Sequence, residues 1–138
     1  NLAARDGYIA DAAARIKLKA LEALPRWCWE LGPSYRAANP EGAAKWREIN
    51  EQSETGKGAR QSLANIVTPA QLETLQVPTL LMTGAADPST PPSITRMIAH
   101  HIPDNEVVIF SEAGHSPYWE QPEAFNRTVL DFIGRHPA

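Results

Sequence analysis

Two short apolar runs near the C-terminal end constrain the fold of this chain more than any other feature. The first run, Thr79–Met82, stops in a turn of small residues that presents Asp87. The second run, Val107–Phe110, stops in a similar turn that presents His115. Uninterrupted apolar runs of this length are typical of buried parallel strands. Because the carboxyl ends of parallel strands meet at one edge of a sheet, we expect Asp87 and His115 to lie together as a proton-shuttling pair.

The segments that follow the two runs have the pattern of helices. Pro92 to His101 places apolar residues on one side, and Pro122 to about Arg135 does the same with Phe125, Val129, Phe132 and Ile133 facing inward. The order β-α-β-α implies right-handed crossovers and a parallel sheet. Two strands alone do not make a stable sheet covered on both faces, so we expect neighbouring strands from polypeptide outside this sequence.

Residues 1–76 have the composition of a helical block, and residues 77–138 form the β-α-β-α part. A helix is expected over Ile9–Leu24, ending at Pro25, and Gly32–Ser34 is expected to be a loop. Three further helix starts are predicted: at Asn39-Pro40, around Leu63–Val67, and at a capping box beginning at Thr68 and running to about Leu75.

Composition excludes several classes of protein. The net charge of −3 over 138 residues offers no basic surface for nucleic acid or an anionic membrane. No apolar stretch approaches the length needed to span a bilayer. Cys28 is the only cysteine, which excludes an intramolecular disulfide and favours a packing role in a reducing cytoplasm. The chain begins at Asn1 on helix-like sequence without a signal-peptide pattern, so we expect it to be cut from a longer precursor.

Two motifs resemble the C-terminal half of α/β-hydrolase-fold proteins. They are Gly84-Ala-Ala-Asp87-x-x-x-Pro91 and Ala113-Gly114-His115-Ser-x-Tyr-Trp-Glu120-x-Pro122-Glu123-x-Phe125. The resemblance covers residues 75–136 and implies that Asp87 is the triad acid and His115 the triad histidine. Residues 1–76 are similar in position and character to the cap, or lid, of that family. The implied fold class is α/β: a helical cap followed by β-α-β-α on a parallel sheet that another chain completes.

The resemblance also implies a hydrolase whose nucleophile lies elsewhere. No serine here sits in G-x-S-x-G, and the family's nucleophile precedes the cap. We therefore expect a carboxylesterase-type acyl hydrolase with a Ser-His-Asp triad, inactive without a second, N-terminal chain that carries the serine and forms a heterodimer with this processed chain. The expected substrate is a small apolar ester or carbonyl compound, with no cofactor and no metal.

Alternatives to this function stay open. Other chemistry of the same fold includes C–C bond hydrolases, epoxide hydrolases, haloalkane dehalogenases and lactonases, and the absent nucleophile leaves the choice among them undecided. A different class is a non-catalytic interaction module derived from a hydrolase. Retention of both Asp87 and His115 in well-formed turns favours an enzyme over the module.

Individual residues near the pair have competing interpretations. Asp87 precedes a proline and is also a typical opener of a turn. Glu112 is an alternative acid partner for His115, whereas Glu120 is expected to stabilise a loop or the start of the last helix. His100 and His101 diverge by about 100° around a helix, which disfavours a shared metal ion.

Aromatic residues supply the candidates for a substrate pocket. Trp27, Trp29 and Tyr35 either line an apolar chamber under the cap or pack between helices, and for Trp46 packing is favoured. Tyr118 and Trp119 follow the histidine directly, so we expect them to shape a wall of the active site.

Overall fold

The computed structural model describes residues 23–53 and 67–137. The helices expected over Ile9–Leu24 and around Leu63–Val67 fall almost entirely outside these residues. Within them, no helix combines the length and the apolar character required to cross a membrane.

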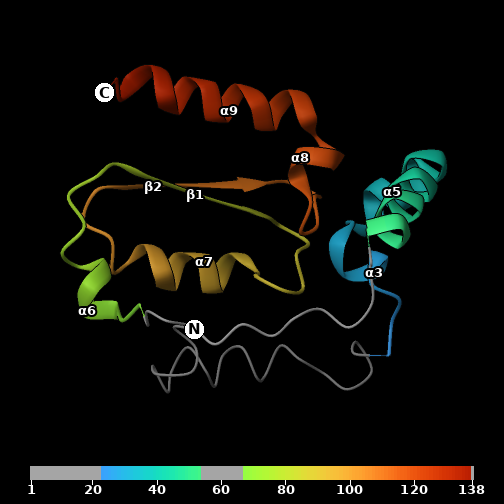
Figure 1. The fold of residues 1–138 in the computed structure, drawn as a ribbon, viewed down its shortest axis with the longest axis horizontal. Coiled ribbons are helices and arrows are strands. Elements are labelled where there is room, and N and C mark those ends of the chain that lie inside the picture. Colours follow the sequence, from blue (N-terminus) through green and yellow to red (C-terminus); the bar gives the residue numbers. More distant parts are fainter. Residues whose placement is uncertain (1–22, 54–66, 138) are drawn as a thin grey trace.

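A two-stranded parallel sheet lies at the centre of the C-terminal part. Strand β1 (Thr79–Gly84) pairs with β2 (Asn105–Phe110) in a register that aligns Thr79 with Asn105 and Gly84 with Phe110. Helix α7 (Pro92–Ala99) connects the strands and lies on one face, and α9 (Pro122–Arg135) lies on the other (Figure 1). The predicted β-α-β-α order and parallel pairing are confirmed, and both strands end at the same edge.

Buried apolar side chains of α7, of the end of β2 and of the turn after it form the core of this part, and Phe110 packs against Phe125 of α9. Ile94 and Ala99 of α7 are buried together with Phe110 at the end of β2 and Ala113 beyond it. On α9 the expected inward face is correct for Phe125, Val129 and Phe132, which are partly buried. It is wrong for Ile133, which is 58% exposed, because this position lies at the border of the stripe, about 80° around the helix from Phe125.

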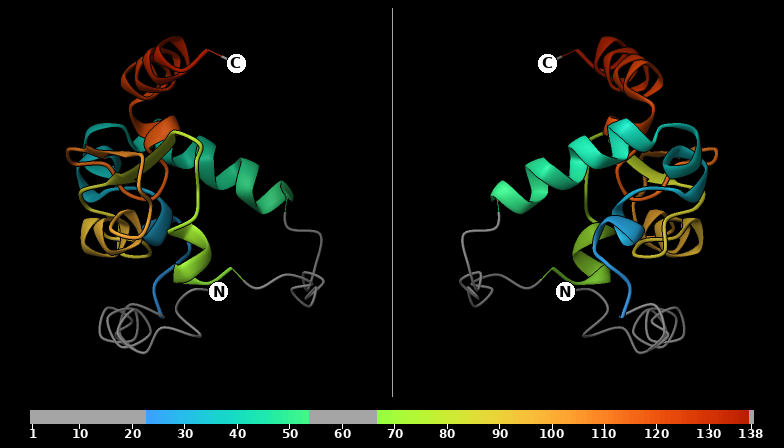
Figure 2. Two further views of the ribbon diagram at one scale, coloured as in Figure 1. Left: turned by 90° about the vertical axis from the view of Figure 1, so that its left-hand side faces the viewer. Right: turned by 90° about the vertical axis from the view of Figure 1, so that its right-hand side faces the viewer.

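Of the described helices that precede the sheet, three lie near the carboxyl ends of the strands. They are α3 (Trp27–Glu30), α4 (Pro33–Ala38) and α5 (Pro40–Ser53). Asn39 caps α5 as expected, with its Oδ1 accepting the N–H of Gly42 at 2.8 Å. The predicted loop at Gly32–Ser34 is wrong, because Pro33 starts α4; a proline is favourable at this position, where an N–H has no helical partner. Helix α5 projects away from the rest of the chain, with its C-terminal end outermost (Figure 2).

The connection into β1 begins with α6 (Pro69–Leu72). The predicted capping box is present, since the Thr68 side chain accepts the N–H of Gln71 and the Gln71 side chain accepts the N–H of Thr68. The helix ends at Leu72 rather than near Leu75, with turn residues following it.

The turns after β1 and β2 approach each other closely. The N–H of Ala85 donates to the carbonyl of Phe110 at 2.8 Å, and the N–H of Ala86 donates to the carbonyl of Ala113 at 2.9 Å. A Cβ on Gly84 would overlap the carbonyl oxygens of Ala113 and Gly114. The small residues that end β1 therefore permit two main-chain segments to lie against each other.

Replacing Gly84 with alanine should destabilise the protein by about 1–3 kcal/mol, because the added methyl meets main-chain atoms that are fixed by hydrogen bonds. Thermal and urea unfolding measure this loss. The matched control is Gly134→Ala in α9, where a Cβ meets nothing within 4 Å and helix propensity gives a gain of up to about 1 kcal/mol. Equal stability of the two variants would contradict the close approach of the two turns.

Candidate active site

The turns after β1 and β2 bring Asp87 and His115 into direct contact. The Nδ1 atom of His115 lies 2.7 Å from Oδ2 of Asp87, across 28 residues of sequence. The Asp87 side chain is only 2% exposed, whereas that of His115 is 42% exposed. A buried carboxylate thus holds Nδ1 of an imidazole that is itself partly open to solvent.

The second carboxylate oxygen of Asp87 organises its own turn. Oδ1 accepts the backbone N–H groups of Ser89 at 2.7 Å and Thr90 at 2.9 Å. The Thr83 hydroxyl donates to the carbonyl of Thr90 at 2.6 Å and lies 3.3 Å from Oδ2. The two interpretations of Asp87 are therefore compatible, because one oxygen closes a turn while the other meets the histidine.

The electrostatics of the pair favour a charged carboxylate beside a charged imidazole. Burial acts to raise the pKa of Asp87, but hydrogen bonds from His115, Thr90 and Ser89 outweigh it, so this pKa lies below its ordinary value. The hydrogen bond to Asp87 raises the pKa of His115 above its ordinary value against partial burial, and the charges of Asp87 and Glu30 add to the increase. An imidazolium formed by proton transfer is thus stabilised here.

Glu112 and Glu120 also lie near the histidine loop, and neither pairs with the imidazole. The Glu112 carboxylate accepts the hydroxyl of Ser34, so the alternative acid partner is engaged elsewhere. Glu120 belongs to α8 (Pro117–Glu120), a single turn that the sequence analysis does not anticipate. Its carboxylate accepts two backbone N–H groups, at Gly32 and Gly114, both at 2.8 Å, which is the loop-stabilising role expected for it.

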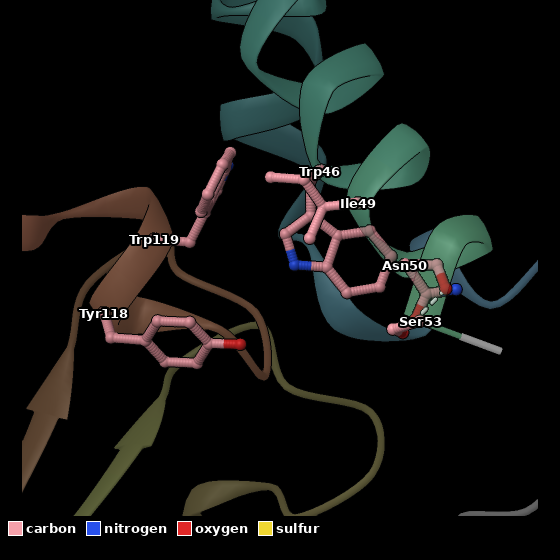
Figure 3. Close-up of a pocket in the computed structure, with 6 residues that line it drawn as sticks. All are labelled: Trp46, Ile49, Asn50, Ser53, Tyr118 and Trp119. Atoms are coloured by element: carbon pink, nitrogen blue, oxygen red, sulfur yellow. Dashed lines mark hydrogen bonds between the residues drawn. The ribbon is translucent and has the colours of Figure 1, made fainter. Parts of the chain in front are cut away.

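Two cavities adjoin the histidine loop. The first, about 260 Å³, contains both members of the pair; its lining is Met82, Thr83, Asp87, Thr90, His115, Pro117, Tyr118 and Phe125. The second, about 280 Å³, lies between α8 and α5 and is lined by Trp46, Ile49, Asn50, Ser53, Tyr118 and Trp119 (Figure 3). Tyr118 lines both cavities, so the two adjoin at this side chain.

The expected pocket residues separate into two groups. Tyr118 and Trp119 line the second cavity with Trp46, whereas Trp29 and Tyr35 line neither cavity. Trp27 also lines neither. It borders a separate hollow that Trp46 lines as well, and the guanidinium groups of Arg36 and Arg47 lie over its ring, 5.2 and 5.5 Å from the centroid.

One side of α5 lines this second cavity. Trp46, for which packing is favoured on sequence, is one of its lining residues, and Ile49, Asn50 and Ser53 of the same helix join it without having been predicted. Their spacing of three, four and seven residues is the repeat of a single helix face, and that periodicity is the signal that identifies the set.

The histidine pair His100-His101 has no arrangement for a metal ion. His101 Nδ1 lies 2.9 Å from Glu73 Oε1, and His100 is exposed at the end of α7. Across residues 23–53 and 67–137, no cluster of three or more histidine, cysteine, aspartate or glutamate side chains is placed to hold a metal. Cys28 is partly buried, and its Sγ accepts a hydrogen bond from Arg36 at 3.3 Å.

The sequence matches the model of a known protein family. The family model described as alpha/beta hydrolase fold matches residues 8–122, most of the chain. This chain belongs to the α/β-hydrolase-fold family, as the two sequence motifs predict.

Curated relatives of the chain are hydrolases. A 2-hydroxy-6-oxononadienedioate/2-hydroxy-6-oxononatrienedioate hydrolase from a Pseudomonas species is 32% identical over 84 residues, 61% of this chain and 28% of the relative. A pimeloyl-acyl-carrier-protein methyl ester esterase from Neisseria meningitidis is 32% identical over 62 residues, 45% of this chain and 24% of that protein. The chain thus spans about a quarter of the length of these relatives.

Solved structures show the same fold over nearly the whole chain. A protein from Mycobacterium tuberculosis superposes with a TM-score of 0.65 at 20% identity, covering 98% of this chain and 53% of that one. A thermophilic esterase from Thermogutta terrifontis gives a TM-score of 0.63 at 21% identity, covering 95% of this chain and 50% of the esterase. At this identity the likeness establishes the fold, and the chain matches about half of each structure.

Asp87→Asn should lower the pKa of His115, because a neutral amide carries no negative charge and its single oxygen is a weaker acceptor than a carboxylate. Titration of the His115 ring by NMR measures the shift, and the midpoint should move to lower pH. Because the pKa of His115 is raised in the folded protein, its pairing with Asp87 stabilises the fold fully at pH values below about 6.5, the ordinary histidine pKa. This stabilisation is lost as the pH rises through the raised pKa of His115. An unchanged midpoint in Asp87→Asn would contradict the pairing.

Proposed function

We propose that this chain contributes the acid and the base of a Ser-His-Asp triad to a hydrolase of the carboxylesterase type. The observation that carries the proposal is the 2.7 Å contact between buried Asp87 and half-exposed His115 beside a cavity at the strand ends. The serine is supplied by a second chain, the N-terminal half of the same hydrolase. The family match supports a hydrolase, and the division between two chains is our inference from the absent nucleophile motif.

In this proposal His115 acts as general base and then as general acid. Its Nε2 takes the proton of the serine hydroxyl as the oxygen attacks the ester carbonyl, and a tetrahedral intermediate forms. The imidazolium then gives that proton to the leaving alkoxide as the C–O bond breaks. Water attacks the acyl-serine with the same help, which releases the acid and regenerates the hydroxyl. Asp87 holds the required tautomer and stabilises the imidazolium in both halves.

The cavity between α5 and α8 supports an apolar substrate. Trp46, Ile49 and Trp119 supply hydrocarbon and aromatic surface, and Tyr118 joins this cavity to the one that contains His115. We infer that the acyl or alkyl part of a small apolar ester or carbonyl compound lies against these side chains while its carbonyl faces the triad. The mechanism requires no cofactor or metal.

Cleavage of a carbon–carbon bond is the second candidate. The observation that favours it is the similarity to several 2-hydroxy-6-oxononadienedioate/2-hydroxy-6-oxononatrienedioate hydrolases, at 32–36% identity over 46–61% of this chain. The same acid and histidine serve both reactions in this proposal. Parallel assays with a vinylogous 1,5-diketone and a short nitrophenyl ester distinguish the two, because the preferred substrate has the larger kcat/KM.

Replacing His115 with alanine should lower kcat for a short-chain nitrophenyl ester at least a thousandfold in the assembled protein, because the serine loses its base. Steady-state kinetics measure the loss. The control is His100→Ala, an exposed histidine at the end of α7, which should retain full turnover. Near-normal turnover in His115→Ala would exclude the triad, and absence of hydrolysis in the wild-type assembly would favour a non-catalytic module.

Replacing Trp119 with alanine should shift the preference toward longer acyl chains. Removal of the indole leaves room for several methylene groups, each worth about 0.8 kcal/mol on burial, so the octanoate-to-butyrate ratio of kcat/KM should rise about tenfold or more. Trp29→Ala serves as the control, since Trp29 lines neither cavity beside the histidine loop. The same ratio in both variants would place the acyl group outside the cavity between α5 and α8.

A further inference from the structure

Glu120 binds the main chain on both sides of His115. Its Oε1 accepts the N–H of Gly114 at 2.8 Å, and its own backbone N–H donates to the carbonyl of Ser116 at 3.0 Å. Ser116 is fully buried and Gly114 is buried as well. The residues on either side of the histidine are therefore fixed to one glutamate, whereas the imidazole itself remains half-exposed.

The other oxygen of the same carboxylate reaches the segment that enters α4. Oε2 of Glu120 accepts the N–H of Gly32 at 2.8 Å, 88 residues away in sequence. Leu31, directly before this glycine, is only 1% exposed. A Cβ on Gly114 would overlap the backbone nitrogen of Gly32, so the two segments are in main-chain contact where the carboxylate holds them.

We propose that Glu120 is the positioning residue of His115, and that it sets the imidazole against Asp87 by fixing the histidine loop to the segment Leu31–Gly32. The inference rests on the proposed catalytic role of His115. Glu120 itself touches neither Asp87 nor the imidazole in the interactions described, so it acts through the loop.

A carboxylate is suited to this position because each of its two oxygens faces an N–H donor. A glutamine of the same size offers one acceptor oxygen, and its amide nitrogen would face the other N–H. One of the two segments then loses its partner, and a donor is left opposite a donor. A displacement of about 1 Å at a catalytic group costs about a hundredfold in rate, so a small movement of the loop is enough to be measured.

The first experiment compares Glu120→Gln with Glu123→Gln in the assembled protein. Glu123 lies in the first turn of α9 and is exposed, which makes it a matched control. For a short nitrophenyl ester, Glu120→Gln should lower kcat about tenfold to a hundredfold with KM changed less than threefold, and Glu123→Gln should match the wild type. Equal kcat in the two variants, or a loss that follows only the fraction of folded protein, would overturn the proposal.

A second measurement separates the positioning role from the proposed reaction. The proton on His115 Nδ1, held by Asp87, gives a low-field NMR signal that does not depend on any substrate. This signal should weaken or shift in Glu120→Gln and stay unchanged in Glu123→Gln. Its loss in Glu120→Gln, combined with full activity of His115→Ala, would retain the positioning role and remove the triad. An unchanged signal would overturn the positioning role.

The wild-type protein offers a test that does not require a variant to fold. The Gly32 and Gly114 amide protons should titrate together with the Glu120 side-chain carbonyl carbon, because one carboxylate accepts both. Burial, opposed by its hydrogen bonds, raises the pKa of Glu120, so the shared midpoint should exceed the ordinary value for glutamate. The other ionisable groups around the loop are Asp87, Glu30, Glu112 and His115, and each has its own carbon resonance. Different midpoints for the two amides would overturn the inference.

Discussion

The site depends on the close approach of two turns at one end of a parallel sheet. Backbone hydrogen bonds join Ala85 to Phe110 and Ala86 to Ala113, and this contact is possible because Gly84 carries no side chain. Once the turns are in contact, Asp87 and His115 face each other at 2.7 Å. The local geometry of the main chain therefore determines the chemistry, and the side-chain pairing follows from it.

Each acidic side chain around the histidine loop has a distinct role because each has different donors within reach. Asp87 divides its two oxygens between the imidazole and its own turn. Glu112 meets a serine hydroxyl of α4, and Glu120 meets two backbone N–H groups from separate segments. Sequence distance from His115 would favour Glu112 as its partner, yet the parallel register brings the carboxylate from 28 residues away.

The sequence was sufficient to predict the strands, the crossover helix, the last helix and the meeting of Asp87 with His115, because these follow from apolar runs and from the shared edge of parallel strands. The start of α4 at Pro33 and the single turn α8 were missed, since short helices carry little periodicity. In the sequence, the residues of α5 that line the second cavity share only the spacing of one helix face. Their partner across the cavity, Trp119, comes from a distant segment and no local pattern connects it to them.

The parallel pairing of β1 with β2 has a consequence for the edges of the sheet. In the part of the chain that the structure describes, the sheet consists of these two strands, so each offers one outer edge of unmatched backbone donors and acceptors. Such edges are templates on which further strands add, and natural proteins cover them to avoid aggregation. The outer edges of β1 and β2 are therefore the places where a further strand would extend this sheet.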